Sequence, residues 1–194
     1  MIRQAEAMLP TDWGNFNMIA FADDKSDKMP HLAMVHENFD NSKSVLLRIH
    51  SECMTGDLFH SNRCECGEQL DAAMKLAAEQ GGIIIYLRQE GRGIGLINKL
   101  KAYKIQDKGV NTADANTHLG LEIDAREYDI AIQIMNDLGI KKVKLLTNNP
   151  DKIEAIENSD IEIEKRIPLV IPPKKENHGY LKTKQDLMGH LFKI

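Results

Sequence analysis

The sequence predicts a mixed α/β (α+β) fold, with a strand-rich N-terminal part followed by alternating strands and helices around a mixed sheet. Two observations lead to this class. Residues 1–52 contain short apolar runs separated by polar stretches, whereas the second half alternates strand-like and helix-like segments. The chain has 194 residues, of which 42% are hydrophobic, so it can bury one full core. We expect residues 1–194 to form a single domain.

Three short strands are predicted in the N-terminal part. Residues 14–21 alternate between apolar and polar side chains, and residues 32–35 and 44–49 are compact apolar runs. The polar stretches 22–28 and 37–43 separate these strands as turns or loops.

Helices and strands alternate after residue 67. A helix is predicted over residues 68–80, because apolar side chains recur there at helical spacing until two glycines end the pattern. A buried-type strand (82–87) and a glycine-rich loop (88–95) follow. The further predicted elements are helices over 96–108, 126–138 and 183–192, a short helix starting at 148–150, and strands over 142–146 and 161–171. Residues 111–122 are polar and give no clear prediction.

Composition excludes several classes of protein. The net charge of -4 and the pI of about 6.0 provide no overall attraction for nucleic acid, so we expect no nucleic-acid partner. The N-terminus lacks a signal-peptide pattern and no apolar run approaches a membrane span, which predicts a cytoplasmic protein without a membrane partner. In a reducing compartment, clustered cysteines bind metal or react more often than they form disulfides.

All three cysteines of the chain, Cys53, Cys64 and Cys66, fall within one short stretch. Zinc prefers thiolate and imidazole ligands, and a catalytic zinc site has three protein ligands with water in the fourth position. Three cysteines therefore indicate a catalytic zinc site. Two alternatives stay open: His50 or His60 could supply a fourth ligand to a structural zinc, or the cysteines could be buried without metal.

Several other polar groups follow predicted strands. The loop at 88–95 carries Arg88 and Arg92 among glycines, a composition that suits phosphate binding. The spacing of its glycines departs from the dinucleotide-binding fingerprint, which argues against an NAD-dependent oxidoreductase. A glycine-rich turn with solvated arginines is the other alternative to a phosphate site. Thr147 and Lys152 follow the strand at 142–146, where ligands bind in open α/β sheets. The pair Asp124 and Arg126, taken alone, is more typical of a helix cap with a surface charge.

Taken together, these motifs resemble one family, GTP cyclohydrolase II of riboflavin biosynthesis. The resemblance runs from about Leu9 to Leu191, with Glu65 as a mild departure where the family pattern has aspartate. The matching stretches are Arg48–Asp57, Arg63–Gly67, Arg88–Leu96, Asp124–Tyr128 and Leu145–Pro150.

The resemblance implies a homodimeric hydrolase that binds GTP, opens its imidazole ring, releases C8 as formate and cleaves off pyrophosphate. The implied product is 2,5-diamino-6-(5-phosphoribosylamino)pyrimidin-4(3H)-one. Many relatives carry a fused dihydroxybutanone-phosphate synthase domain, for which 194 residues leave no room, so we expect a monofunctional GTP cyclohydrolase II domain.

The resemblance also assigns roles to individual residues. It implies one Zn²⁺ per subunit on the three cysteines, Mg²⁺ with the triphosphate, Asp124 as proton acceptor, Arg126 as nucleophile toward the α-phosphorus, and Tyr103 near C8 of the guanine. The implied GTP contacts are Arg48, Ile49, His50, Ser51, Glu52, Gln69, Glu90, Gly91, Arg92, Thr112, Thr147 and Lys152.

One implied role conflicts with the chemistry of the side chain. A guanidinium has a pKa above about 12 and is not ordinarily a nucleophile. A rival hypothesis is that Arg126 stabilises charge in the transition state while Asp124 directs a water. A catalytically silent homologue that holds zinc and a nucleotide is the alternative to the enzyme as a whole.

Overall fold

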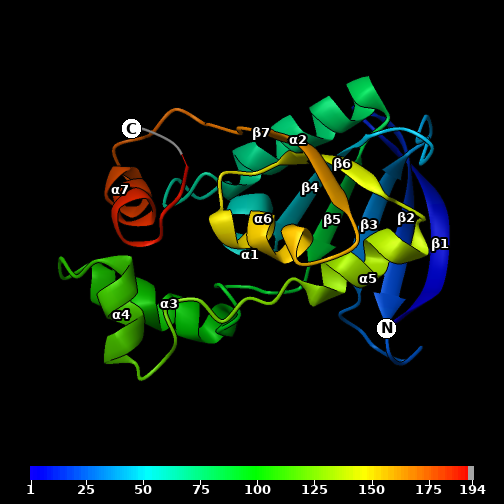
Figure 1. Ribbon diagram of the computed structural model, residues 1–194. Coiled ribbons are helices and arrows are strands. Elements are labelled where there is room, and N and C mark those ends of the chain that lie inside the picture. Colours follow the sequence, from blue (N-terminus) through cyan, green and yellow to red (C-terminus); the bar gives the residue numbers. More distant parts are fainter. Residues whose placement is uncertain (192–194) are drawn as a thin grey trace.

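The computed structural model describes residues 1–191, and its centre is one mixed sheet of seven strands (Figure 1). The strand order across the sheet is β1-β2-β3-β5-β4-β6-β7. The strands are β1 (Ile2–Thr11), β2 (Gly14–Ala22), β3 (His31–His36), β4 (Val45–Ser51), β5 (Ile83–Leu87), β6 (Lys142–Leu146) and β7 (Glu162–Ile167).

Pairing divides the sheet into two parts. Strands β1, β2, β3 and β5 pair antiparallel in that order, whereas β5–β4, β4–β6 and β6–β7 are parallel. The carboxyl ends of β4, β5 and β6 therefore lie at the same edge of the sheet, where ligands bind in α/β folds. The predicted fold class, a strand-rich N-terminal part followed by alternating elements around a mixed sheet, is confirmed.

Helices cover both faces of the sheet (Figure 1). Helix α2 packs on β4 and β5 from one face, and α5 and α6 contact the sheet from the other. Helices α3, α4 and α7 lie beyond the end of the sheet, beside the carboxyl ends of its parallel strands. The helices are α1 (Met54–Asp57), α2 (Cys66–Gln80), α3 (Gly95–Gln106), α4 (Thr112–His118), α5 (Asp129–Asp137), α6 (Pro150–Glu157) and α7 (His178–Leu187).

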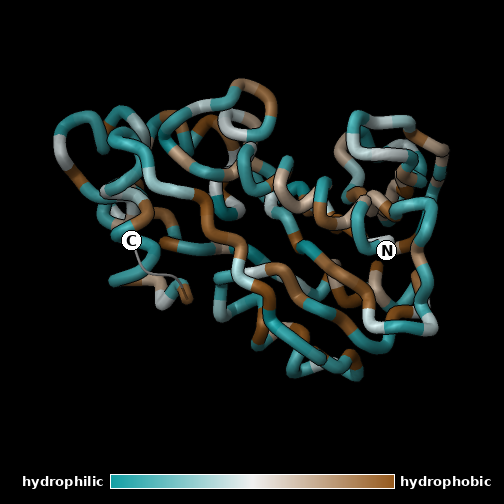
Figure 2. Tube along the Cα trace, turned by 90° about the horizontal axis from the view of Figure 1, so that it is seen from above, coloured by the Kyte–Doolittle hydropathy of each residue, from teal (hydrophilic) through white to brown (hydrophobic). Residues whose placement is uncertain are grey.

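The covering of both faces explains why β5 is a continuous apolar run. Ile83 and Ile85 face the core under α5 and α6, whereas Ile84 faces the smaller core under α2. Side chains alternate between the faces of a strand, so a strand buried on both faces needs no polar positions. Figure 2 shows the hydrophobic segments concentrated in the central strands, with hydrophilic loops around them.

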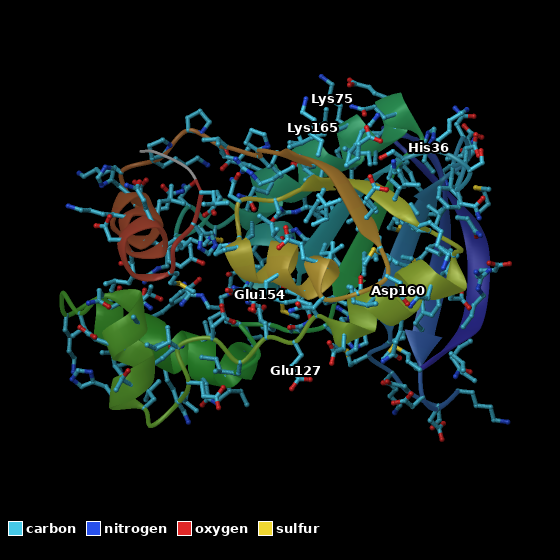
Figure 3. All side chains as sticks on the ribbon, viewed as in Figure 1. His36, Lys75, Glu127, Glu154, Asp160 and Lys165 are labelled. Carbon is cyan, nitrogen blue, oxygen red and sulfur yellow. The ribbon has the colours of Figure 1, made fainter. Side chains whose placement is uncertain are left out.

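The outer surface of these layers is polar. The exposed side chains of Lys75 on α2, Glu154 on α6 and Lys165 on β7 project away from the core (Figure 3). None of the helices within residues 1–191 combines the length and the apolar character that a membrane crossing requires.

Some elements depart from the sequence prediction. Strand β1 lies outside the predicted ranges, because nearly all of its side chains are exposed and its sequence does not alternate. The four-residue helix α1 was too short to have a periodic signal. Helix α4 occupies part of the segment without a prediction, and its polar sequence is helical because the side chain of Asn111 accepts hydrogen bonds from Ala113 N and Asp114 N.

The helix predicted from residue 126 begins only at Asp129. The backbone N–H groups of the three preceding residues form hydrogen bonds outside the helix. Ala125 N donates to Arg92 O, Arg126 N to Asp124 Oδ1, and Glu127 N to Gln89 Oε1. The two bonds to the glycine-rich loop, with the local bond to Asp124, keep Asp124 and Arg126 out of the helix.

Two C-terminal elements also have shifted bounds. Strand β7 ends at Ile167 instead of residue 171, since Pro168 has no N–H to donate to a neighbouring strand. The last helix begins at His178 instead of residue 183 and ends at Leu187. Residue 192, the predicted end of this helix, lies outside the described residues.

Candidate active site

A cleft opens at the carboxyl ends of the parallel strands. Its walls come from the segment after β4, the start of α2, the glycine-rich loop, α3, α4, the segment after β6, and α7. Its empty volume is about 1020 Å³, which includes the open mouth. The cleft thus lies where ligands bind in open α/β sheets.

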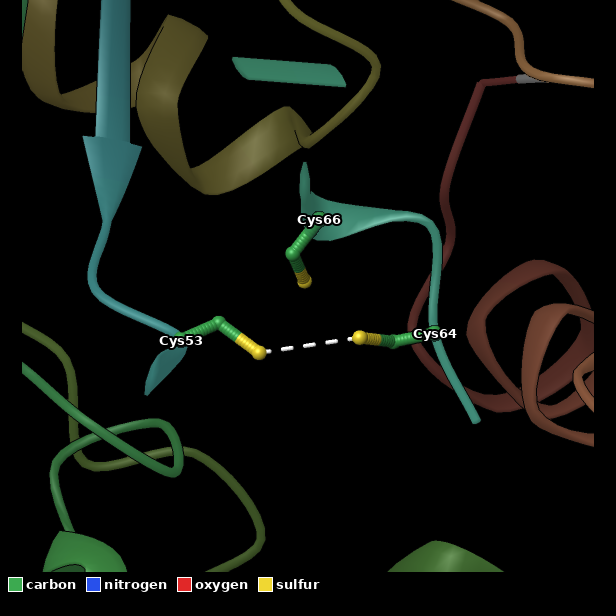
Figure 4. A group of neighbouring side chains, drawn as sticks. All are labelled: Cys53, Cys64 and Cys66. Carbon is green, nitrogen blue, oxygen red and sulfur yellow. Dashed lines mark hydrogen bonds between the residues drawn. The ribbon is translucent and has the colours of Figure 1, made fainter. Parts of the chain in front are cut away.

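The three cysteines meet in this cleft (Figure 4). Their Sγ atoms all lie within 4.8 Å of one another, and those of Cys53 and Cys64 are 3.6 Å apart. Sulfurs bound tetrahedrally to one zinc ion at about 2.3 Å would be about 3.8 Å apart. Among residues 1–191 the group includes no histidine: His50 binds Asp57 instead, and His60 is exposed. The donor set therefore fits a three-ligand zinc site with an open fourth position.

Two glycines allow the cysteine segments to approach one another. A Cβ added at Gly56 would lie 2.9 Å from Cys64 Sγ and 3.2 Å from Cys53 Sγ. A Cβ added at Gly67 would lie 2.3 Å from the carbonyl oxygen of Gly56. The contact between α1 and the start of α2, which places the sulfurs, thus requires glycine at both positions.

Asp57 fixes the backbone of Cys53 through a hydrogen bond. Its carboxylate, almost fully buried, accepts hydrogen bonds from the backbone N–H of Cys53 (2.9 Å) and from the hydroxyl of Tyr86 (2.8 Å). It also lies 3.1 Å from Nε2 of His50. Because one buried carboxylate binds three groups, Asp57 sets the position of both β4 and the Cys53 backbone.

The cysteine thiols of the cluster differ in pKa. Hydrogen bonds from Cys64 and Cys66 lower the pKa of Cys53, and the contact with Cys53 raises the pKa of Cys64 to about 12. Lys99 donates to Cys53 Sγ (3.1 Å) and to Glu90 Oε1 (2.7 Å). The cluster therefore holds one thiolate readily, and a cation is needed to displace the remaining protons.

The glycine-rich loop places its backbone in a conformation that favours glycine. Gly91, Gly93 and Gly95 have φ values of 63°, 89° and 79°, and Arg92, a non-glycine residue, has a φ of 61°. Glu90 holds the loop by accepting from Met54 N and Gly91 N, both at 2.6 Å. Strain at a non-glycine residue is typical of functional sites.

Three cations of the cleft have no carboxylate partner within 4 Å among residues 1–191. Arg48 donates to Leu146 O (3.0 Å) and Gln69 Oε1 (2.8 Å), Lys152 donates to Ile49 O (2.9 Å), and Arg92 is 3.5 Å from Ile123 O. Arg48 Nε and Arg92 Nη2 are buried without a hydrogen-bond partner in this part of the chain. Burial lowers the pKa of Arg48 to about 10, and it also lowers the pKa of Lys152. Arg48, Arg92 and Lys152 therefore have no anionic partner within the described part of the chain.

Asp124 and Arg126 form a two-point ion pair at the edge of the cleft. Arg126 Nε donates to Asp124 Oδ1 at 2.8 Å, and Nη2 donates to Oδ2. Burial alone would lower the pKa of Arg126, but the hydrogen bonds with Asp124, together with the charges of Tyr128, Asp124 and Tyr180, outweigh it and raise that pKa. The pair keeps the guanidinium charged.

Tyr103 lies on α3 beside the cysteines. Burial raises its pKa to about 12, so its hydroxyl is protonated at neutral pH and can donate a hydrogen bond. The Arg63 guanidinium lies 4.8 Å from the centroid of its ring. Thr112, the first residue of α4, accepts from Gln106 Nε2 at 3.4 Å on the same side of the cleft.

Comparison with known proteins decides the family. Residues 2–168 match the family model described as GTP cyclohydrolase II. The chain belongs to this family.

Its relatives include both long and short proteins. It is 48% identical over 193 residues to riboflavin biosynthesis protein RibBA of Bacillus cereus, and 50% identical over 186 residues to RibBA of Endomicrobium trichonymphae. These matches cover 99% and 95% of this chain, but the chain spans only about half the length of each relative, 48% and 46%. GTP cyclohydrolase-2 of Neisseria meningitidis is 50% identical over 189 residues, covering 97% of this chain and 95% of that protein.

Nearly all the residues that the family resemblance singles out line the cleft of this GTP cyclohydrolase II family member. Two do not line it themselves. Ile49 is fully buried in the core and presents only its carbonyl group, to Lys152, and Asp124 reaches the cleft through Arg126. The predicted residues in the lining are Arg48, His50, Ser51, Glu52, Cys53, Cys64, Cys66, Gln69, Glu90, Gly91, Arg92, Tyr103, Thr112, Arg126, Thr147 and Lys152.

Sequence reasoning missed several residues of the cleft. Lys99, Tyr180 and Lys184 line it, and Asp57 supports it from behind. Lys99 and Lys184 resemble ordinary surface charges on amphipathic helices, and each binds a group distant in sequence, Cys53 and Glu65 respectively. No local pattern could have identified them.

Proposed function

We propose that this chain is a zinc-dependent GTP cyclohydrolase II. It hydrolyses GTP to 2,5-diamino-6-(5-phosphoribosylamino)pyrimidin-4(3H)-one, formate and pyrophosphate, the first step of riboflavin biosynthesis. One observation carries the proposal: three clustered thiols line the same cleft as three cations that have no carboxylate partner among residues 1–191. Family membership and the name of the Neisseria meningitidis relative support it.

The thiol cluster supports the hydrolytic part of the reaction. Cys53, Cys64 and Cys66 would hold one Zn²⁺, and their spacing suits it. Bound there, zinc would supply Lewis-acid activation of water at neutral pH. Tyr103, protonated and beside the cluster, would donate a hydrogen bond to the oxygen or nitrogen on which charge develops during ring opening.

The three cations that have no carboxylate partner among the described residues support triphosphate binding. Arg48, Arg92 and Lys152 are held in place by neutral acceptors, so their charges remain available to an anion. Guanidinium groups bind phosphate oxygens through parallel hydrogen bonds, and buried lysine adds a point charge. Mg²⁺ bridging the phosphates would share this role, since Mg²⁺ is commonly bound through substrate oxygens. The remaining implied GTP contacts, among them Thr112 and Thr147, belong to the same proposal.

The ion pair of Asp124 and Arg126 would act at the phosphoanhydride. Its two-point geometry favours a charged guanidinium that stabilises the transition state over a deprotonated nucleophile. Asp124 would then direct the attacking water. A phosphoryl-arginine adduct isolated without acid treatment would contradict this assignment and favour the nucleophilic role.

We further propose a cytoplasmic homodimer built from one GTP cyclohydrolase II domain over residues 1–194, without nucleic-acid or membrane partners. The acidic net charge supports the absence of a nucleic-acid partner. Exposed apolar side chains, including Phe59 and Ile97, offer surface for a subunit interface.

The proposal is tested by incubating the zinc-loaded protein with GTP and Mg²⁺ and measuring formate and pyrophosphate. We expect both products in equal amounts, and the loss of formate release after zinc is removed. Saturable GTP binding without formate would instead establish the catalytically silent zinc-containing homologue.

A further inference from the structure

Helix α7 contributes to the cleft although it lies beyond residues 2–168, which the family model matches. Tyr180 and Lys184 of this helix line the same cleft as the cysteines. Figure 1 shows α7 away from the sheet and close to α4, with which it is in contact. The last described part of the chain thus returns to the site formed by the central strands.

Contacts on both sides of α7 fix its position. Before the helix, Lys174 Nζ binds Glu68 Oε1 and Asn62 Oδ1, each at 3.0 Å, and so attaches the chain to the start of α2. After the helix, Leu191 N donates to Asn148 O at 2.8 Å, in the segment that follows β6. Helix α7 is therefore attached to two walls of the cleft.

Lys184 points from α7 toward the cysteines. Its Nζ lies 2.6 Å from Oε1 of Glu65, the residue between Cys64 and Cys66, and the two side chains are only 12% and 2% exposed. The other oxygen of Glu65, Oε2, is buried and has no hydrogen-bond partner among the described residues. The ammonium group of Lys184 has three N–H donors, and the bond to Glu65 uses one of them, so the others can reach a ligand in the cleft.

The charge of Lys184 acts on the same space as the other cations. Burial lowers the pKa of Lys152, and the positive charges of Arg48, Arg126 and Lys184 lower it further. Like charges that converge in a low-dielectric cleft repel one another unless an anion lies between them. Lys184 therefore belongs to the cation group that faces the cleft.

Tyr180 contacts the opposite wall. The Arg92 guanidinium lies 5.4 Å from the centroid of the Tyr180 ring, within the range of a cation–π contact. Arg92 is the non-glycine residue of the glycine-rich loop with a left-handed backbone, and its Nη2 is buried without a hydrogen-bond partner in residues 1–191. The ring of Tyr180 holds this guanidinium from one side and leaves Nη2 for a ligand.

We propose that α7 completes the nucleotide site, with Lys184 binding the phosphate groups of the substrate and Tyr180 orienting Arg92 toward them. On binding, Lys184 keeps one N–H on the carboxylate of Glu65 and donates the others to phosphate oxygens. This inference rests on the proposed function, because it names further residues that meet the polyphosphate of the same substrate.

Binding of inorganic triphosphate to the zinc-loaded full chain, measured by calorimetry, tests the proposal. We expect Lys184→Gln to weaken binding about tenfold or more, since a charge-assisted hydrogen bond is lost. Lys182→Gln is the matched control, because Lys182 is an exposed lysine on the same helix. The triphosphate affinity of this variant should equal that of the parent. Unchanged binding by Lys184→Gln would overturn the proposal.

Glu65→Gln separates a binding role from a structural one. If Lys184 binds phosphate, removing the carboxylate frees its ammonium, and triphosphate affinity is kept or increased. If the ion pair only holds α7 in place, Glu65→Gln and Lys184→Gln weaken binding equally, and the proposal fails. Should Lys184→Gln lower the melting temperature, Lys184→Arg decides: it keeps the charge and must restore most of the affinity.

The formate assay distinguishes this inference from the proposed function. An active parent whose triphosphate affinity is insensitive to Lys184→Gln overturns only the role of α7. A parent that releases no formate, but loses triphosphate affinity in Lys184→Gln, overturns only the assigned reaction.

Discussion

Replacing Gly56 by alanine tests whether the three cysteines act as one metal site. The new Cβ would lie 2.9 Å from Cys64 Sγ, 3.0 Å from Cys66 Cβ and 3.2 Å from Cys53 Sγ. Because comfortable contacts begin near about 3.5 Å, the cysteine side chains must move by about 0.5 Å. Metal–ligand distances tolerate only about 0.2 Å. We expect zinc affinity to fall by about 10- to 100-fold, the effect of disturbing groups that orient metal ligands.

The assay is competition for zinc with a chromophoric chelator, which reports affinity without relying on activity. Gly179→Ala serves as the control, because a Cβ there would meet no atom within 4 Å. Circular dichroism checks that both variants are folded. Zinc affinity in Gly56→Ala equal to that of the parent would refute the reasoning that this glycine sets the spacing of the sulfurs.

Three further predictions address separate parts of the cleft. Cys66→Ser should abolish formate release while some pyrophosphate release survives, because the thiol cluster is assigned to ring opening and the cations to the phosphoanhydride. Lys152→Met should raise the melting temperature of the ligand-free protein while weakening GTP binding about tenfold or more, because it removes a buried charge held by one carbonyl group. Burial, aided by the charge of Lys184, lowers the pKa of His190 from 6.5 to about 3. The unfolded chain then binds a proton that the folded chain excludes, so stability falls as pH drops below 6.5, by about 1.4 kcal/mol at pH 5.5. His190→Asn should lose this part of the pH dependence in urea unfolding.

Each of these predictions has an outcome that contradicts it. Equal loss of both products in Cys66→Ser would show that the two chemistries are not divided between the thiols and the cations. A lower melting temperature in Lys152→Met would mean that the buried ammonium stabilises the fold. If His190→Asn and the parent lose the same stability between pH 7.5 and 5.5, the imidazole does not carry the effect.

The sequence predicts the elements whose burial follows a simple period. Helix α2 was predicted within two residues of its bounds because its apolar side chains recur at helical spacing, and β5 because a short continuous apolar run is typical of a strand buried on both faces. Strand β1 could not be predicted, since its residues pair through the backbone and bury few side chains. The start of α5 could not be predicted either, because the bond from Ala125 N to Arg92 O joins segments distant in sequence.

The candidate site divides in the same way. The cysteines and the glycine-rich loop were visible because unusual residues cluster locally in the sequence. Lys184 was invisible, since its partner Glu65 is 119 residues away and only the fold brings them to 2.6 Å. A charged residue whose role depends on a partner far away in the sequence produces no periodic or local sequence pattern that could identify it.

Zinc-dependent release of formate from GTP is the measurement that tests the proposed reaction most directly. The zinc-loaded protein should release formate and pyrophosphate in a one-to-one ratio, and removal of zinc should abolish formate. A zinc-loaded, folded protein that binds GTP but releases no formate would contradict the assignment of the thiol cluster to ring opening.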